Sequence, residues 1–132
     1  MRASILVVDD DQGVRETFAH TLRHEGYDVR TAPNAEIGLS EVKAARTDAI
    51  ILDLRMPLIN GIGFLYRLRA QAETRELPVA VITGDHCVKE ALCEEMQELG
   101  AELFYKPLWV EDIVDLTRNL LDKPRRLQPP VH

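Results

Sequence analysis

The sequence predicts an α/β domain built on a doubly wound parallel sheet with helices on both faces. Apolar runs such as SILVV, AIILD and PVAVIT do not alternate with polar residues, as expected of parallel strands that are covered by helices. These runs are separated by longer stretches of helical period. Five β-α units therefore follow one another in strict order, which is the pattern of a parallel α/β sheet.

The expected strands are short, and most of them are apolar on both faces. The stretch YDVRTA alternates more and is therefore expected at an edge of the sheet. The five expected strands are Ser4–Val8, Tyr27–Ala32, Ala49–Asp53, Pro78–Thr83 and Glu102–Lys106.

Five helices are expected after these strands, each with an apolar stripe that faces the sheet. Gly26 and Gly100 are placed to end the first and fourth helices, and Asn34 is placed to cap the second. A loop over residues 55–61 precedes the third helix, and Trp109 is expected to anchor the start of the last one by packing. The expected inward residues are Val14, Phe18, Leu22, Ala35, Leu39, Val42, Phe64, Leu65, Leu68, Val88, Leu92, Met96, Leu99, Ile113, Leu116 and Leu120.

Length and composition restrict the class of protein. With 132 residues the chain is expected to form one domain over residues 1–122, followed by a Pro-rich disordered tail or linker stub over 123–132. The apolar runs are too short to cross a bilayer, and the amino terminus lacks a secretion signal, so a cytoplasmic protein is expected. A formal charge of −6 argues against direct binding to nucleic acid or to anionic lipid. Cys87 and Cys93 are expected to be reduced thiols.

Polar side chains follow four of the expected strands at the point where each strand ends. Asp9 and Asp10 follow the first strand, Asp53 ends the third, Thr83 ends the fourth and Lys106 ends the fifth. Because ligands of open parallel sheets bind outside the carboxyl ends of the strands, these residues form a candidate site at one rim. Any one of them has an ordinary explanation as a capping or turn residue, but their combination does not serve stability alone.

The acids at this rim suggest a metal site. Carboxylates from two neighbouring strands, together with water and a backbone carbonyl, form an incomplete oxygen cage that suits Mg²⁺ and offsets the repulsion among the acids. An ammonium and a hydroxyl at the same rim can stabilise a phosphoryl group. A carboxylate that faces the vacant metal position is then placed to act as a nucleophile and to become an acyl phosphate.

At these residues the chain resembles the receiver domain of bacterial two-component response regulators. The resemblance covers roughly Ser4 to Leu121, and it depends on four motifs in order rather than on any single one. The motifs are VVDD (Val7–Asp10), ILDLRMP (Ile51–Pro57) followed by Asn60-Gly61, VITG (Val81–Gly84) and YKP (Tyr105–Pro107). The resemblance implies a flavodoxin-like (βα)5 fold with strand order 2-1-3-4-5.

The resemblance also implies a role for each residue at the rim. Asp53 is expected to be the phosphoacceptor, which receives a phosphoryl group from a histidine of a sensor kinase or phosphotransfer protein. Asp10 and Asp53 are expected to bind Mg²⁺ directly, and Asp9 mostly through water, with the backbone carbonyl of Arg55 as a further ligand. Such a domain catalyses its own phosphorylation and dephosphorylation but turns over no external substrate.

The remaining expectations from the resemblance concern the switch and its output. Lys106 is expected to pair with the phosphoryl group and to precede a cis peptide bond, and Thr83 to move toward the phosphoryl group. The conformational change is expected to control an output domain or a downstream protein. The face formed by the fourth helix, fifth strand and fifth helix is a possible homodimer contact.

One departure from the family pattern concerns the residue three positions before the lysine, which is usually aromatic. Here it is Leu103, and Tyr105 is expected on the opposite face of the strand. This departure keeps open a second interpretation, in which the chain is a pseudo-receiver that binds partners without being phosphorylated. A phosphohydrolase related to haloacid dehalogenases ranks last, because Gln12 stands where those enzymes usually have glycine.

Two further sequence features lead to weaker hypotheses. Arg55 and Asp85 are expected to overhang the site, where their pairing would lengthen the life of the acyl phosphate; two solvated charges are an equally good interpretation. His20 and His24 have the spacing of a two-histidine metal site, but a solvated helix face is the better interpretation.

Overall fold

The computed structural model describes residues 2–54, 58–84, 90–106 and 108–122, and it forms one five-stranded parallel sheet with five helices. The strands are β1 (Ser4–Val8), β2 (Asp28–Ala32), β3 (Ala49–Leu54), β4 (Val79–Thr83) and β5 (Ala101–Tyr105). The helices are α1 (Gln12–His24), α2 (Ala35–Ala44), α3 (Leu58–Ala70), α4 (Glu90–Glu98) and α5 (Val110–Asp122). The predicted tail over 123–132 lies outside the described residues.

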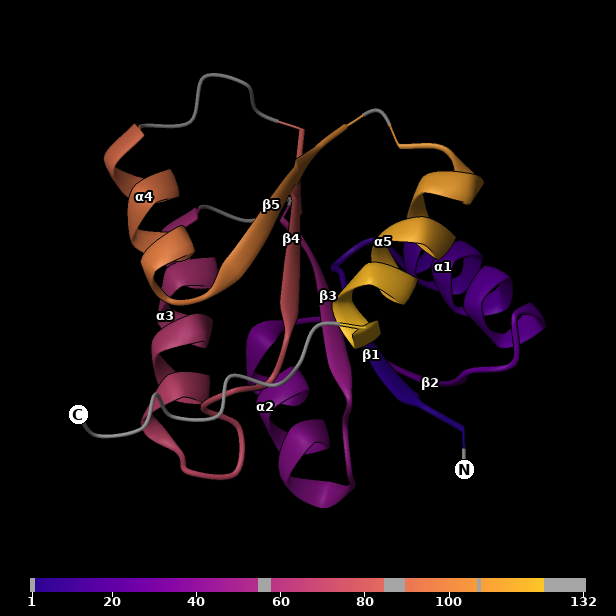
Figure 1. The fold of residues 1–132 in the computed structure, drawn as a ribbon, viewed down its shortest axis with the longest axis horizontal. Helices are drawn as coiled ribbons and strands as arrows, with labels where there is room; N and C mark the ends of the chain where they lie inside the picture. Colours follow the sequence, from indigo (N-terminus) through magenta and orange to yellow (C-terminus); the bar gives the residue numbers. More distant parts are fainter. Residues whose placement is uncertain (1, 55–57, 85–89, 107, 123–132) are drawn as a thin grey trace.

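The strand order is β2-β1-β3-β4-β5, so the predicted doubly wound topology is confirmed and β2 is an edge strand. Helices α2, α3 and α4 cover one face of the sheet, and α1 and α5 cover the other (Figure 1). Alternate residues of each strand supply the two cores. Leu6, Ile50 and Leu52 belong to the first core, while Ile5 and Ile51 belong to the second.

Three helix termini follow from the local sequence. The side chain of Asn34 accepts a hydrogen bond from the backbone N–H of Ile37 at 2.9 Å, which caps α2 as predicted. Gly26 and Gly100 follow α1 and α4 with φ values of 96° and 82°, a left-handed conformation that other residues adopt only with strain.

The third helix begins earlier than the sequence predicts. Residues 55–61 were expected to form a loop, but α3 already includes Leu58 to Gly61. Gly61 is buried within the helix, and packing of α3 against the sheet outweighs its low helix propensity. Val88, which was expected on the inner face of the fourth helix, lies outside the described residues.

The prediction for Trp109 is wrong. Its side chain is 72% exposed, and its backbone N–H donates to Asp112 Oδ2 at 2.7 Å at the start of α5. The apolar stripe of α5 is completed by Ile113, Leu116 and Leu120 without the indole ring. None of the described helices is long and apolar enough to cross a membrane.

Candidate functional site

The carboxyl ends of β1, β3 and β4 place three polar side chains in the interior of the rim. Asp9, Asp53 and Thr83 are 0%, 0% and 3% exposed. β1 pairs directly with β3, and β3 pairs directly with β4, so the ends of these strands are adjacent. Burying two carboxylates this close together costs free energy unless cations or hydrogen-bond donors compensate their charge. This rim is therefore the strongest candidate for a functional site.

Lys106 reaches this group from the end of β5. Its ammonium nitrogen lies 2.9 Å from Asp53 Oδ1, and its backbone N–H donates to the carbonyl of Thr83 at 2.9 Å. The backbone contact therefore holds the lysine beside the end of β4, while its side chain reaches over to β3. Among the described residues, no hydrogen-bond donor reaches Asp53 Oδ2, although this oxygen is buried.

The acid group of Asp9 has a strongly perturbed pKa. Burial raises the pKa of Asp9 to about 7, and the neighbouring carboxyl groups of Asp53 and Asp10 act in the same direction. The backbone N–H of Asp11 donates to Asp9 Oδ1 at 2.9 Å and opposes part of this increase in pKa. The protein therefore holds an acid pair, Asp9 and Asp53, in which ionisation of both groups is unfavourable without a further cation.

The start of α1 fixes the position of Asp9. Asp11 is the N-cap of this helix, and its Oδ1 accepts from the backbone N–H of Val14 at 3.0 Å. Arg15 in the first turn donates to the backbone carbonyl of Asp9 at 2.8 Å. The sequence prediction did not include Arg15; the available signal was an arginine one helical turn after the capping aspartate.

The structure brings some of the predicted metal ligands together and leaves another apart from them. The remaining one lies outside the described residues. Asp9 and Asp53 meet in the interior, whereas Asp10 is exposed. Arg55, with its predicted carbonyl ligand, and Asp85, its predicted pairing partner, lie outside the described residues. In the part of the chain that the structure describes, no group of three or more His, Cys, Asp or Glu side chains is arranged to hold a metal ion. Mg²⁺ does not need such a group, because it is commonly held by one or two carboxylates and several waters.

The prediction for Tyr105 is wrong. Leu103 packs against the core cluster that includes α4, Phe104 packs on the opposite face, and the Tyr105 hydroxyl lies 3.9 Å from Cys93 Sγ of α4. Residues two apart in a strand share a face, so Tyr105 lies on the same side as Leu103. The fifth strand therefore does present an aromatic ring toward α4, two residues later than the family pattern places it, and this ring is 41% exposed.

The two histidines of α1 line a hollow between α1 and α5. His20 and His24 face Glu111 and Asp115 of α5 across a cavity of about 450 Å³. This hollow is separate from the acid rim, and no metal cluster of three ligands is formed there by the described residues.

The fold and the rim together define a class: a CheY-like α/β domain of the flavodoxin-like type with a buried aspartate at the end of its central strand. The chain belongs to the response regulator receiver domain family, which matches residues 5–118. It is thus a receiver domain of a two-component response regulator, as the sequence motifs indicated.

Several known proteins are similar to this chain. It is 34% identical to the response regulator MprA of Mycobacterium bovis over 130 aligned residues. The alignment covers 98% of this chain and 54% of MprA. The chain thus spans about half the length of the curated relatives that it matches. Among solved structures, the chemotaxis protein CheY4 of Vibrio cholerae has a TM-score of 0.82 and 30% identity, and covers 92% of this chain and 100% of its own. The receiver domain of NtrX from Brucella abortus has a TM-score of 0.77 and 26% identity, and covers 91% of this chain and 99% of its own.

Proposed function

We propose that this chain is a phosphoacceptor switch in which Asp53 receives a phosphoryl group from a histidine of a sensor kinase or phosphotransfer protein. The observation that carries the proposal is the buried Asp53 carboxylate, which has Lys106 at 2.9 Å on one oxygen and no described donor on the other. A structural ion pair alone does not require a second buried acid beside it. The switching unit in this proposal is residues 1–122, acting in the cytoplasm.

The chemistry follows from the charges at the rim. An oxygen of Asp53 attacks phosphorus while the phosphorus–nitrogen bond to the donor histidine breaks, and the bonding electrons return to the imidazole. Lys106 is ion-paired with the acceptor before the reaction, and its ammonium is close enough to pair with the phosphoryl oxygens afterwards. The Thr83 hydroxyl is the hydrogen-bond donor that we assign to the same group.

Mg²⁺ fits the acids of this rim, and its chemical contribution would be to offset the negative charge of the carboxylates and of the transferred phosphoryl group. Asp10 and Asp53 are the direct ligands that we assign, with Asp9 acting through water and the backbone carbonyl of Arg55 as a further ligand. The raised pKa of Asp9 supports this assignment, because it marks a place where the chain by itself supplies too little positive charge.

The proposed output acts through the surface formed by α4, β5 and α5. Helix α4 carries four glutamates and no basic residue, so a second copy apposed through this surface would bring like charges together. We therefore assign this surface to contact with an output domain or a downstream protein in preference to a homodimer contact. We assign neither membrane binding nor nucleic-acid binding to this chain. The conformational change, rather than turnover of an external substrate, is the proposed activity.

The test is the intact mass of the protein after incubation with acetyl phosphate, with and without Mg²⁺. Wild-type protein is expected to gain one phosphoryl group only with Mg²⁺, and Asp53→Asn to gain none. Asp11→Asn is the matched control, because asparagine caps a helix as well as aspartate does and the backbone N–H that residue 11 donates to Asp9 is kept in this variant. It is expected to be phosphorylated like the wild type.

Two results would contradict the proposal. Phosphorylation that persists in Asp53→Asn would assign another acceptor. A folded wild-type protein that gains no phosphoryl group in the presence of Mg²⁺ would support the pseudo-receiver interpretation, which Leu103 at the usual aromatic position favours.

A further inference from the structure

A groove lies between α2 and α3 at the end of the molecule opposite to the acid rim. It consists of two neighbouring hollows with cavity volumes of about 520 and 310 Å³. The hollows adjoin each other, because both are lined by Val42, Lys43, Gln71 and Thr74. The larger hollow is bounded by the chain that leads from α2 into β3 and by the chain between α3 and β4. These segments precede the strands, whereas the acid rim lies where the strands end.

The composition of the groove combines an apolar lining with a cationic rim. Leu39, Val42, Leu68 and Leu77 supply the apolar side chains. The exposed side chains of Lys43 and Arg67 stand at its edges, and in the described structure neither forms an ion pair. Positive charge on an apolar groove is unexpected in a chain with a net charge of −6.

The other charged residues of the groove do not remove this positive character. Arg46 is held by Asp48, with Nη2 and Oδ2 3.0 Å apart, and Glu73 is the acid that lines the larger hollow. Lys43 and Arg67 therefore remain the charges that an incoming group would meet at the smaller hollow.

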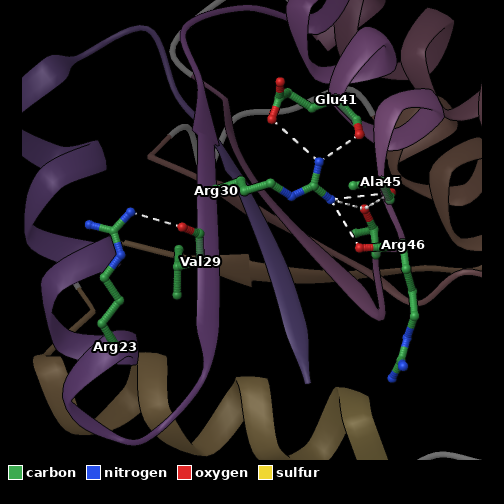
Figure 2. Close-up of polar contacts among 7 residues, drawn as sticks. Arg23, Val29, Arg30, Glu41, Ala45 and Arg46 are labelled. Carbon is green, nitrogen blue, oxygen red and sulfur yellow. Dashed lines mark hydrogen bonds and ion pairs between the residues drawn. The ribbon is translucent and has the colours of Figure 1, made fainter. Parts of the chain in front are cut away.

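The wall formed by α2 is fixed by Arg30 of β2. The guanidinium donates to the Glu41 carbonyl at 2.6 Å, to Thr47 Oγ1 at 2.5 Å and to the Arg46 carbonyl at 3.1 Å (Figure 2). The Glu41 carbonyl also accepts from the backbone N–H of Ala45 at 3.3 Å, so the guanidinium adds a second donor there and supplies a donor to the Arg46 carbonyl beyond the helix. The end of α2 and the segment that follows it are therefore held in one arrangement.

The wall formed by α3 is fixed by Arg69 in a similar way. Its Nη1 donates to the carbonyls of Thr74 at 3.1 Å and Leu77 at 2.7 Å, and its Nε donates to the Leu99 carbonyl at 2.6 Å. A groove whose two walls are held by internal hydrogen bonds is formed before a ligand arrives, so less ordering opposes binding.

We propose that this groove, hereafter the α2–α3 groove, binds an acidic peptide segment of a partner protein. Apolar side chains of the segment occupy the two hollows, and its carboxylates face Lys43 and Arg67. The volumes and the apolar lining are those of a site for side chains. A nucleic acid is disfavoured, because binding a phosphate backbone requires many more cations than this groove presents.

The position of the groove makes the inference independent of phosphorylation. Asp53 and Lys106 lie at the ends of strands, so a kinase that reaches Asp53 leaves the α2–α3 groove open. The groove would thus recruit a partner at one end of the molecule while the other end exchanges phosphoryl groups. Binding is expected to persist in Asp53→Asn.

The experiment selects ligands from a displayed library of random peptides on immobilised wild-type protein. The enriched peptides are then synthesised, and their binding is followed by the backbone amide shifts of the labelled protein. Lys43→Glu reverses one charge at the groove. Arg118→Glu is the matched control, since Arg118 is an exposed arginine of α5 on the other face of the sheet.

The expected peptides combine Asp or Glu with bulky apolar residues, and they shift the amides of Val42, Lys43, Gln71 and Thr74. Lys43→Glu is expected to weaken their binding about fivefold or more, whereas Arg118→Glu leaves it within about twofold of the wild type. Enrichment of peptides without acids, shifts confined to other surfaces, equal effects of the two variants, or no enrichment at all would each overturn the proposal.

Discussion

The acid pair at the rim makes the metal-free protein less stable than it would be without Asp9's charge. Asp9 is 0% exposed, and burial together with Asp53 and Asp10 raises its pKa from the ordinary value of 3.8 to about 7. Asp9→Asn removes the charge but retains an acceptor for the backbone N–H of Asp11, and the new amide can donate to Asp53. We therefore expect this variant to be more stable than the wild type near neutral pH.

The sign and size of the effect follow from linkage between protonation and folding. Between pH 3.8 and about 7 the unfolded chain has lost the Asp9 proton while the folded chain keeps it, so stability falls as pH rises through this range. At about 1.4 kcal/mol per pKa unit, a difference of about 3 units corresponds to roughly 4 kcal/mol as an upper limit. The advantage of Asp9→Asn should thus be small near pH 4 and approach a few kcal/mol at about pH 8.

The assay is urea unfolding in the presence of EDTA at a series of pH values. Far-UV circular dichroism is the suitable signal, because Trp109 is already 72% exposed in the folded protein and its fluorescence would change little. The free energy of unfolding of the wild type is subtracted from that of the variant at each pH. The contributions of groups that titrate equally in both proteins cancel in this difference. Asp10→Asn is the control, since Asp10 is exposed and is the smallest of the causes that raise the pKa of Asp9, so its substitution should change stability less. A difference that stays below about 1 kcal/mol, or that shrinks as pH rises, would refute the reasoning.

Four further predictions concern α2, α3 and the residues that hold their ends, each measured by the free energy of unfolding. Gly38→Ala should destabilise by about 1–3 kcal/mol, because a Cβ there would lie 3.1 Å from a Val8 methyl and 3.3 Å from the Phe64 ring, both fully packed. Gly63→Ala is its contrast: nothing lies within 4 Å of the added Cβ, so a gain of about 0.5–1 kcal/mol is expected, and a loss would contradict the packing argument. Arg30→Met should cost about 1–3 kcal/mol by removing the guanidinium from the Arg46 carbonyl and the Thr47 hydroxyl, while the Glu41 carbonyl keeps the Ala45 N–H; no loss would mean that water replaces the guanidinium. Asn34→Ala should cost about 1 kcal/mol through loss of the α2 cap, whereas Asn34→Asp should retain most of the stability.

The parallel α/β fold class and the rim positions of four polar residues could be predicted from the sequence pattern, whereas the strand order followed from the resemblance to receiver domains. Uninterrupted apolar runs and helical stripes are local signals, and parallel strands place all their carboxyl ends at one edge. The positions of Asp9, Asp53, Thr83 and Lys106 at that edge follow from where each strand stops. No knowledge of side-chain packing was needed for this step.

The features that the sequence did not predict depend on contacts between distant residues. Arg15 reaches the Asp9 carbonyl, and Arg30 reaches across from β2 to the end of α2, but neither position differs locally from a solvated arginine. The exposure of Trp109 likewise depends on whether three-dimensional neighbours cover it. The position of Tyr105 is different: the period-2 rule places residues 103 and 105 on one face, so the error there was in applying the rule and not in the sequence signal.

The two ends of the sheet satisfy their polar groups in opposite ways. At the amino ends, Arg30 and Arg69 donate to backbone carbonyls, and Arg30 also donates to the Thr47 hydroxyl; these contacts fix the walls of the α2–α3 groove. At the carboxyl ends, the described residues set a single ammonium, that of Lys106, beside two buried carboxylates. Folding is expected to gain nothing from the charge of the second carboxylate, since Asp9→Asn keeps the acceptor for the Asp11 N–H and is expected to stabilise the chain. A charge that destabilises the metal-free fold is explained if the rim has to bind a cation and then a phosphoryl group, which is the role that the proposed function gives to Asp9.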